Sequence, residues 1–271
     1  MKLFYNNYLK SASVVSSTSA QASYPVSNIL QDTSLTFWRP TTTATQTIVY
    51  DLGSAQRVEA AFVSFPKHLC TDFTTKNCAI TLEGSTTSNF ASVGVSVVLT
   101  APLNQSSGLS HNDFAFNWAT LEAGTYSFRY WRVIFSSIAS TNLSVSNIFL
   151  GKKFEFAQNG FDVKFTESIL NTSIVNTNYL GRKFVLSSPV TQRAFGLSIS
   201  TMNKTELESW RDTIVYAHQK TVPFWIAIDT GTYISSSLPM LTSFVYAESI
   251  GELSHETFGI WNTTLSCSEV I

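Results

Sequence analysis

The stretch Gln46–Phe65, QTIVYDLGSAQRVEAAFVSF, carries the strongest signal for the fold of this chain. Two apolar runs, Thr47–Tyr50 and Val58–Phe65, flank a polar turn that begins at Asp51. Short apolar runs bounded by turn residues are typical of β-strands. We therefore predict a strand on each side of this turn.

A second stretch, Tyr130–Gly151 or YWRVIFSSIASTNLSVSNIFLG, is predicted to be its partner. Apolar and polar residues alternate in its first half, so one face of a strand would be buried. The apolar residues of that face are Trp131, Val133 and Phe135, and a closing strand is predicted at Val145–Leu150. Further short strands are predicted at Ala79–Glu83, at Gly94–Thr100 and through Phe114, Phe116 and Trp118. Many short strands between turns favour a β-sandwich or jelly roll.

The composition limits the classes of function. Of 271 residues, 44% are hydrophobic and only 13% are charged, with a net charge of −1. Without a basic patch, binding to nucleic acid is not expected. A surface so poor in charge has little repulsion between copies, so we expect other subunits to cover much of it. No run is apolar enough for a membrane span or a signal peptide, and we expect folding in the cytoplasm.

The second half of the chain is predicted to be a separate mainly β unit that begins after Gly151. Its helix is expected at Lys204–Gln219, started by a capping box of Thr205 with Glu208 or of Asn203 with Glu206. The apolar stripe of this helix consists of Leu207, Trp210, Ile214 and Ala217. The strands of the unit are predicted at Arg193–Ser200, Pro223–Asp229, Leu241–Glu248 and Glu256–Val270. The predicted division is an N-terminal arm (1–23), a first β-sandwich (24–151) and a second one carrying the helix (152–271).

No set of residues predicts catalysis, so an enzyme is not expected. Ser110, His111 and Asp113 share a loop, but the Gly-x-Ser-x-Gly turn of many hydrolases is absent from the sequence. A hydrolase of cell-surface polymers is a third hypothesis, and it is disfavoured because no residue of the sequence resembles an activated nucleophile. A metal site at His255 with Glu252 and Glu256 is disfavoured against a solvated loop. We expect no metal and no cofactor. Cys70 and Cys78 are read as two thiols or, in an oxidising medium, as a pair.

Binding is better supported than catalysis. Aromatic and polar side chains in or near loops of the first unit suit the recognition of a sugar ring. The candidates for binding a glycan are Trp38, Arg39, His68, Phe73 and Trp118. The alternative for Trp38 and Trp118 is a place in the core.

The first unit resembles the discoidin-type domain, the coagulation-factor C-type jelly roll, over residues 24–151. The resemblance rests on Ile48–Ser54 with Val58, on Tyr130–Phe135 and on the closing Val145–Gly151. Members of that family often bind glycans or lipid head groups through loops at one end of the sandwich. The chain lacks the disulfide clasp of the animal members.

The second unit resembles the tail-tube-like sandwich of bacteriophage tail-tip and distal tail proteins. The residues that carry this are Arg193–Ser200, Thr205–His218, Val222–Ile228 and Trp261–Val270. The resemblance implies a structural subunit of the virion tail or baseplate, assembled in the host cytoplasm. The subunit would form a homo-oligomeric ring, and its other partners would be tube, hub and fibre proteins of the tail. The candidates for the oligomer interface are Trp210, Arg211, Phe224 and Trp225. The alternative is a carbohydrate-binding module or adhesin that contacts host surface glycans.

Overall fold

The computed structural model describes most of the chain, in two compact units. The described residues are 2–31, 36–66, 78–100, 114–121, 126–138, 143–155, 164–170, 174–177, 183–186, 192–216, 221–227, 242–255 and 260–270. Unit 1 comprises Met1–Glu155 and Phe224–Ser243, and unit 2 comprises Phe156–Pro223 and Phe244–Ile271. The prediction of a mainly β protein is confirmed.

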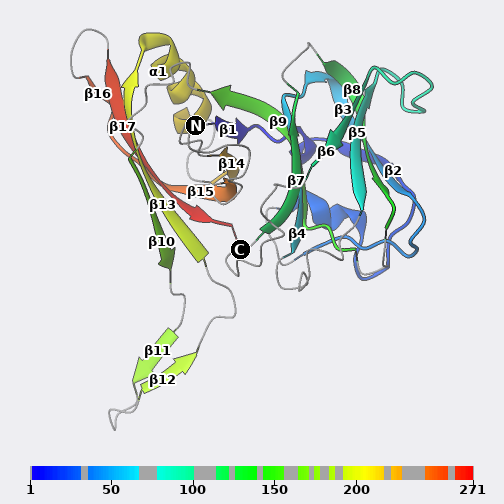
Figure 1. Ribbon diagram of the computed structural model, residues 1–271, viewed down its shortest axis with the longest axis horizontal. Helices are drawn as coiled ribbons and strands as arrows, with labels where there is room; N and C mark the ends of the chain where they lie inside the picture. The colour runs from blue at the N-terminus through cyan, green and yellow to red at the C-terminus, as the bar shows by residue number, and fades with distance from the viewer. Residues whose placement is uncertain are drawn as a thin grey trace. The chain divides into compact units, whose positions relative to one another are not determined.

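Unit 1 contains a five-stranded antiparallel sheet with the strand order β2-β3-β8-β5-β6 (Figure 1). Its strands are β2 (Ser13–Ser17), β3 (Gln46–Arg57), β8 (Ser127–Ser136), β5 (Ala79–Ser85) and β6 (Val95–Leu99). The two stretches that the sequence singled out meet here, because Tyr50 of β3 pairs with Trp131 of β8.

The facing layer of unit 1 has the order β7-β4-β9-β1-β14, and its neighbouring strands are antiparallel. Its strands are β7 (Phe114–Thr120), β4 (Ala60–Pro66), β9 (Asn147–Glu155), β1 (Lys2–Tyr5) and β14 (Phe224–Ala227). One buried apolar cluster joins the two layers, with Trp131, Val133 and Phe135 from β8 and Ala61 and Val63 from β4. The alternation of β8 and the β-sandwich of this unit are therefore as predicted.

The predicted N-terminal arm is wrong. Residues 2–5 form β1, which pairs with β9, and residues 13–17 form β2, which pairs with β3. Leu3 and Phe4 are fully buried. An isolated arm could not bury these side chains, and the sheet gives β1 backbone partners on both edges. The residues Phe224–Ser243, predicted to belong to the second unit, group with unit 1.

The Asp51-Leu52-Gly53 motif bends β3. Gly53 has a φ of +77°, a left-handed conformation that glycine adopts without steric cost. Asp51 Oδ1 accepts a hydrogen bond from the Gly53 amide at 2.7 Å and from Arg129 Nε at 2.8 Å. The register of β3 against β8 shifts between Asp51 and Gln56. The motif therefore makes an irregularity in the strand and not a turn between two strands.

Unit 2 is built on an antiparallel sheet in which β13 and β17 are central. Its strands are β10 (Lys164–Leu170), β13 (Gln192–Met202), β17 (Trp261–Glu269) and β15 (Thr242–Ile250), with β16 (Ser254–His255) also paired to β17. A separate hairpin joins β11 (Ile174–Thr177) to β12 (Lys183–Leu186). Leu265 and Cys267, two residues apart on β17, are both buried, as expected for side chains on one face of a strand.

The helix of unit 2 begins with the capping box of Asn203 and Glu206, the second of the two predicted pairs. The Asn203 side chain accepts from the Glu206 amide, and Glu206 accepts from the Asn203 amide, both at 2.9 Å. Helix α1 (Lys204–Trp210) continues as a π-helical segment, η4 (Arg211–Tyr216). The predicted helix is thus not α-helical throughout, and the β-branched run Thr213–Val215 disfavours regular α-helix there. The last predicted residues, 217–219, lie outside the described residues.

Candidate functional site

The position of Arg39 is set by its buried neighbour Trp38. The Trp38 amide donates to the Val145 carbonyl at 2.8 Å and the Val145 amide donates back at 3.0 Å. Trp38 is fully buried, and its Nε1 donates to the Ser19 carbonyl at 3.0 Å. The prediction that Trp38 contacts a glycan is therefore wrong, and the core alternative holds. Since side chains alternate along extended backbone, Arg39 projects to the other side.

Phe37 and Arg39 flank Trp38 and meet the same third residue, Tyr24. The Tyr24 and Phe37 rings are stacked, with centroids 4.7 Å apart and an interplanar angle of 16°. The Arg39 Cζ atom lies 4.9 Å from the Tyr24 centroid and 5.0 Å from the Phe37 centroid. Nearly equal distances to two stacked rings place the guanidinium beside the stack and not between the rings. Arg39 therefore leaves the outer face of Tyr24 uncovered.

The three side chains of Phe37, Tyr24 and Arg39 differ in how far they are buried. Phe37 is buried, whereas Tyr24 and Arg39 are half-buried. The Arg39 amide donates to the Tyr24 carbonyl at 3.3 Å, and Arg39 Nε donates to Ser144 Oγ at 2.8 Å. The Gln21 amide donates to the Arg39 carbonyl at 2.9 Å. Residues 21–24 thus hold the backbone of Arg39, and Ser144 holds its guanidinium. We call Tyr24, Phe37, Arg39 and Ser144 the Arg39 site.

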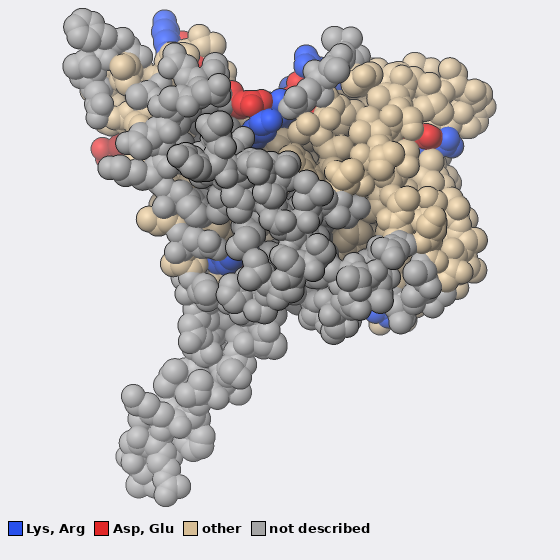
Figure 2. All heavy atoms as spheres, viewed as in Figure 1, with Lys and Arg blue, Asp and Glu red and all other residues tan. Residues whose placement is uncertain are grey.

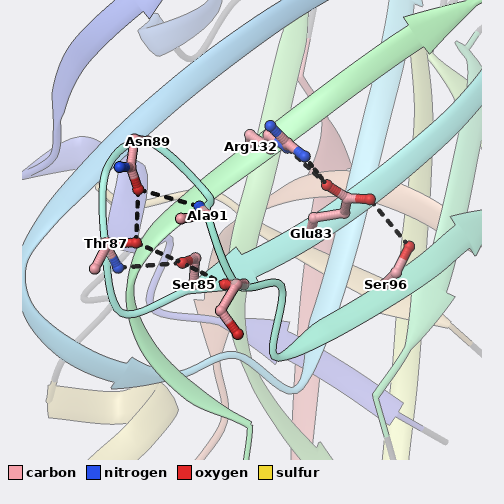
Figure 3. A network of polar contacts seen from close by, with 8 residues as sticks. Glu83, Ser85, Thr87, Asn89, Ala91, Ser96 and Arg132 are labelled. Atoms are coloured by element: carbon pink, nitrogen blue, oxygen red, sulfur yellow. Dashed lines mark hydrogen bonds and ion pairs between the residues drawn. The ribbon is translucent and has the colours of Figure 1, made fainter.

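A second arginine beside an aromatic ring provides a useful contrast, and Figure 3 shows its polar contact with Glu83. Arg132 Cζ lies 4.3 Å from the centroid of the Phe90 ring, and its Nε donates to Glu83 Oε2 at 2.6 Å. The other oxygen of Glu83 accepts from Ser96 Oγ at 3.3 Å. The charge of Arg132 is therefore already compensated within the sheet, and its donors are engaged.

Arg39 differs from the other described arginines in having no acidic partner. Arginine and carboxylate are paired at Arg57–Glu59, Arg129–Asp51, Arg132–Glu83, Arg193–Glu269 and Arg211–Asp212. In the part of the chain that the structure describes, Arg39 forms no ion pair; its side-chain partners are Ser144 and the two rings. Its terminal nitrogens therefore keep donors for a ligand.

The other glycan candidates do not join Arg39. Trp118 is half-buried and stacks on Phe62, with centroids 5.7 Å apart and planes at 20°. Phe62 alternates along β4 with Ala61 and Val63, which line the core that also contains Trp38. Trp118 therefore lies on the opposite face of its sheet from Trp38. His68 and Phe73 lie outside the described residues.

Sequence reasoning found Arg39 but missed its partners Tyr24, Phe37 and Ser144. The available signal was the i, i+2 spacing of Phe37 and Arg39 around a buried tryptophan, which puts both on one side of an extended strand. No comparable signal links them to Tyr24 or Ser144, which are brought in by the fold.

The oligomer-interface candidates are mostly internal. Trp210, Phe224 and Trp225 are fully buried within the chain. Arg211 is exposed and lies 3.4 Å from Asp212 in an ion pair. The prediction that these three aromatic residues form an oligomer interface is therefore wrong, because their apolar area is already removed from water inside the chain.

Groups for catalysis or metal binding are sparse in the described residues. His255 is exposed, with its ring 4.7 Å from the Trp261 ring, and Glu256 lies outside the described part. No cluster of three or more potential metal ligands is found among the residues that can be described. Within that same part, no helix is long and apolar enough to cross a membrane. Cys267 is a buried free thiol and Cys78 is half-buried, while Cys70, Ser110, His111 and Asp113 lie outside the described ranges.

Comparison with known proteins gives fold-level similarities. No protein-family model and no curated protein matches the sequence. Among solved structures, a CBM32 module of a Clostridium perfringens family 31 glycoside hydrolase is 12% identical, with a TM-score of 0.39, and covers 55% of this chain and 99% of its own. The family 32 module of C. perfringens NanJ, solved with galactose, is 11% identical, with a TM-score of 0.37 and coverages of 56% and 100%. The N-terminal domain of the strand-break repair protein XRCC1 is 14% identical, also with a TM-score of 0.37, over 56% and 99%. At these scores no ligand is inferred from them.

Proposed function

We propose that unit 1 is a carbohydrate-binding module and that the Arg39 site binds a sugar ring. The observation that carries this proposal is the Tyr24–Phe37 stack with the Arg39 guanidinium fixed beside it. A sugar has apolar C–H faces and a rim of hydroxyl groups. It therefore suits a site with an aromatic platform and a few positioned polar donors.

The site is pre-organised for such a ligand. Phe37 is buried beneath Tyr24 and supports its ring, while Ser144 fixes the Arg39 side chain through Nε. Rigid aromatic and arginine groups lose little conformational entropy on binding. The Tyr24 hydroxyl makes no hydrogen bond to any described residue, and it adds a donor and acceptor at the edge of the platform.

The proposal is tested with a glycan array and with titration calorimetry of the hits. Tyr24→Ala is expected to abolish or strongly weaken binding, because it removes the outer ring of the platform. Tyr130→Ala is the matched control: Tyr130 is half-buried and lies 5.1 Å from Arg129, whose charge is compensated by Asp51. Binding to no glycan, or equal binding by the Tyr24→Ala variant and the control, would contradict the proposal.

A second proposal is that the chain is a structural subunit of a phage tail tip. The supporting observation is a surface with little charge, as the described atoms in Figure 2 illustrate, together with exposed valines on the edge strands of the five-stranded sheet. Val15 of β2 is 48% exposed and Val98 of β6 is 60% exposed. Uncharged edges with apolar side chains favour pairing between chains.

The two proposals are compatible, since a tail protein can contact host glycans. The second is tested by sedimentation of the purified chain and by imaging of assembled particles. We expect a closed oligomer in solution, and we expect Val15→Lys with Val98→Lys to dissociate it. A monomeric chain that is absent from particles would rule out this proposal.

A further inference from the structure

We infer that the ligand of the Arg39 site carries a carboxylate, which makes it an acidic sugar such as a uronic or sialic acid. This inference rests on the proposed function and adds the chemical class of the sugar. It starts from the difference between Arg39 and the other described arginines. Each of those is paired with an Asp or Glu, at Arg57, Arg129, Arg132, Arg193 and Arg211.

Because Arg39 is half-buried, an anion that pairs with it would contribute to the free energy of binding. The guanidinium is partly withdrawn from water by the Tyr24 and Phe37 rings. These rings carry no negative charge, so they do not neutralise the guanidinium. Burying a charge without a counter-ion is unfavourable, so an anion arriving at this site would recover free energy that a neutral ligand could not.

The donor geometry selects the kind of anion. Arg39 Nε is engaged by Ser144 Oγ at 2.8 Å, which fixes the plane of the guanidinium. The two terminal nitrogens then present parallel N–H donors, and this fork matches the two oxygens of a carboxylate. The ring of an acidic sugar would lie on Tyr24 while its carboxylate reaches Arg39. A neutral sugar would lie on the same platform and offer Arg39 only hydroxyl groups, which carry no charge to offset that of the guanidinium.

The experiment compares ligands that differ only in charge. The probes are 3′-sialyllactose and a glucuronic acid oligosaccharide, each beside its methyl ester, titrated into the full chain by calorimetry. We expect the acid to bind at least about tenfold more tightly than its ester, since hydrogen bonds between two charged groups are stronger than those to a neutral oxygen. The preference for the acid should shrink as NaCl is raised, because salt screens a partly exposed charge pair.

Variants separate the charge from the platform. Arg39→Gln should abolish the preference for the acid, so that acid and ester bind equally, and it should weaken binding of the ester much less than binding of the acid, since the Tyr24 ring remains. Arg39→Lys keeps the charge but not the fork, and should retain only part of the preference. Arg129→Gln is the control, because Arg129 already has Asp51 as partner. Thermal unfolding and near-UV circular dichroism check that each variant is folded.

The outcomes distinguish the two levels of the proposal. Equal affinity for acid and ester, with Tyr24→Ala still weakening both, would overturn the acidic ligand and leave the carbohydrate-binding function in place. A preference for the acid that survives Arg39→Gln would also overturn the assignment to Arg39. Binding of neither probe, together with an empty glycan array, would overturn both.

Discussion

The indole of Trp225 stacks on the ring of Phe62, with centroids 4.5 Å apart and an interplanar angle of 8°. Phe62 belongs to β4 and Trp225 to β14, so residues far apart in the sequence share one aromatic cluster within unit 1. Phe4 of β1 completes it, edge-on to Phe62 at 4.9 Å. All three side chains are fully buried. This cluster explains why Trp225 is a core residue.

Replacing Trp225 should therefore test stability and not association. Trp225→Ala is expected to lower the free energy of unfolding by about 3–5 kcal/mol, because it removes a large buried side chain and leaves a cavity. Urea titration followed by circular dichroism measures this loss. Val98→Ala, at a site that is 60% exposed, is the control and should change little. Similar midpoints for the two variants would contradict the buried stack.

The carboxylate of Asp51 should make stability depend on pH in acid. Hydrogen bonds from Arg129, and then the one from the Gly53 amide, lower the pKa of Asp51 in the folded chain. Because the folded-state pKa lies below the unfolded value of about 3.9, the stabilisation is complete above that value and is lost as the pH falls through the folded-state pKa.

Two variants isolate this effect. Asp51→Asn keeps an oxygen that can accept from the Gly53 amide but removes the titrating charge, so its urea midpoint should fall less steeply between about pH 5 and pH 2. Arg129→Gln removes the largest cause of the lowered pKa and should also flatten the profile. A wild-type slope in either variant would disprove the role of this pair.

Gly151 is expected to be required for docking of β1. A Cβ atom at this position would lie 2.5 Å from the Phe149 ring and 2.6 Å from the Tyr5 carbonyl oxygen of β1. Gly151→Ala should therefore push β1 away and destabilise unit 1 by roughly 1–3 kcal/mol. Hydrogen exchange of the Leu3 and Phe4 amides should become faster.

Gly53→Ala is the matched substitution for that experiment. A Cβ at Gly53 meets nothing within 4 Å, so its cost comes from the φ of +77° alone, about 1–2 kcal/mol. It should destabilise β3 locally without selectively accelerating exchange in β1. Unchanged exchange at Leu3 in the Gly151→Ala variant would refute the close approach.

The buried ion pair of unit 2 should be costly to break on one side only. Arg193 Nε donates to Glu269 Oε1 at 2.8 Å, the Arg193 amide donates to Oε2 at 3.1 Å, and both side chains are buried. Glu269→Leu removes the carboxylate that faces the buried Arg193 guanidinium, and we expect a loss of about 3–5 kcal/mol in the free energy of unfolding. Adding Arg193→Met should restore most of the lost free energy of unfolding.

The exposed Lys204–Glu208 pair is the control, because Glu208→Gln should have no measurable effect on stability. A double variant as unstable as the single one would contradict this account.

Much of unit 1 could be read from local patterns. The alternation of Trp131, Val133 and Phe135 predicted the buried face of β8, since a strand turns every second side chain to the same side. The choice of capping box also lay in the sequence, but only the observed bonds separate Asn203 with Glu206 from Thr205 with Glu208. Neither candidate breaks a local rule, so the pattern alone could not decide.

The Arg39 site could be predicted only in small part from such local patterns. The sequence indicates Arg39 as a candidate because it lies in or near a loop beside Trp38, but Trp38 is a core residue. Whether an aromatic residue faces water or the interior depends on which segments pack against it, and the composition of its own segment does not contain that information.

The order of residues is sufficient to specify strands and their buried faces, because these follow from interactions between near neighbours along the chain. Packing in three dimensions specifies that Tyr24 and Ser144 reach Arg39 and that Trp225 lies on Phe62. Such contacts form only when distant segments bury their apolar surface together, and that free energy belongs to the assembled layers and to no single stretch of sequence.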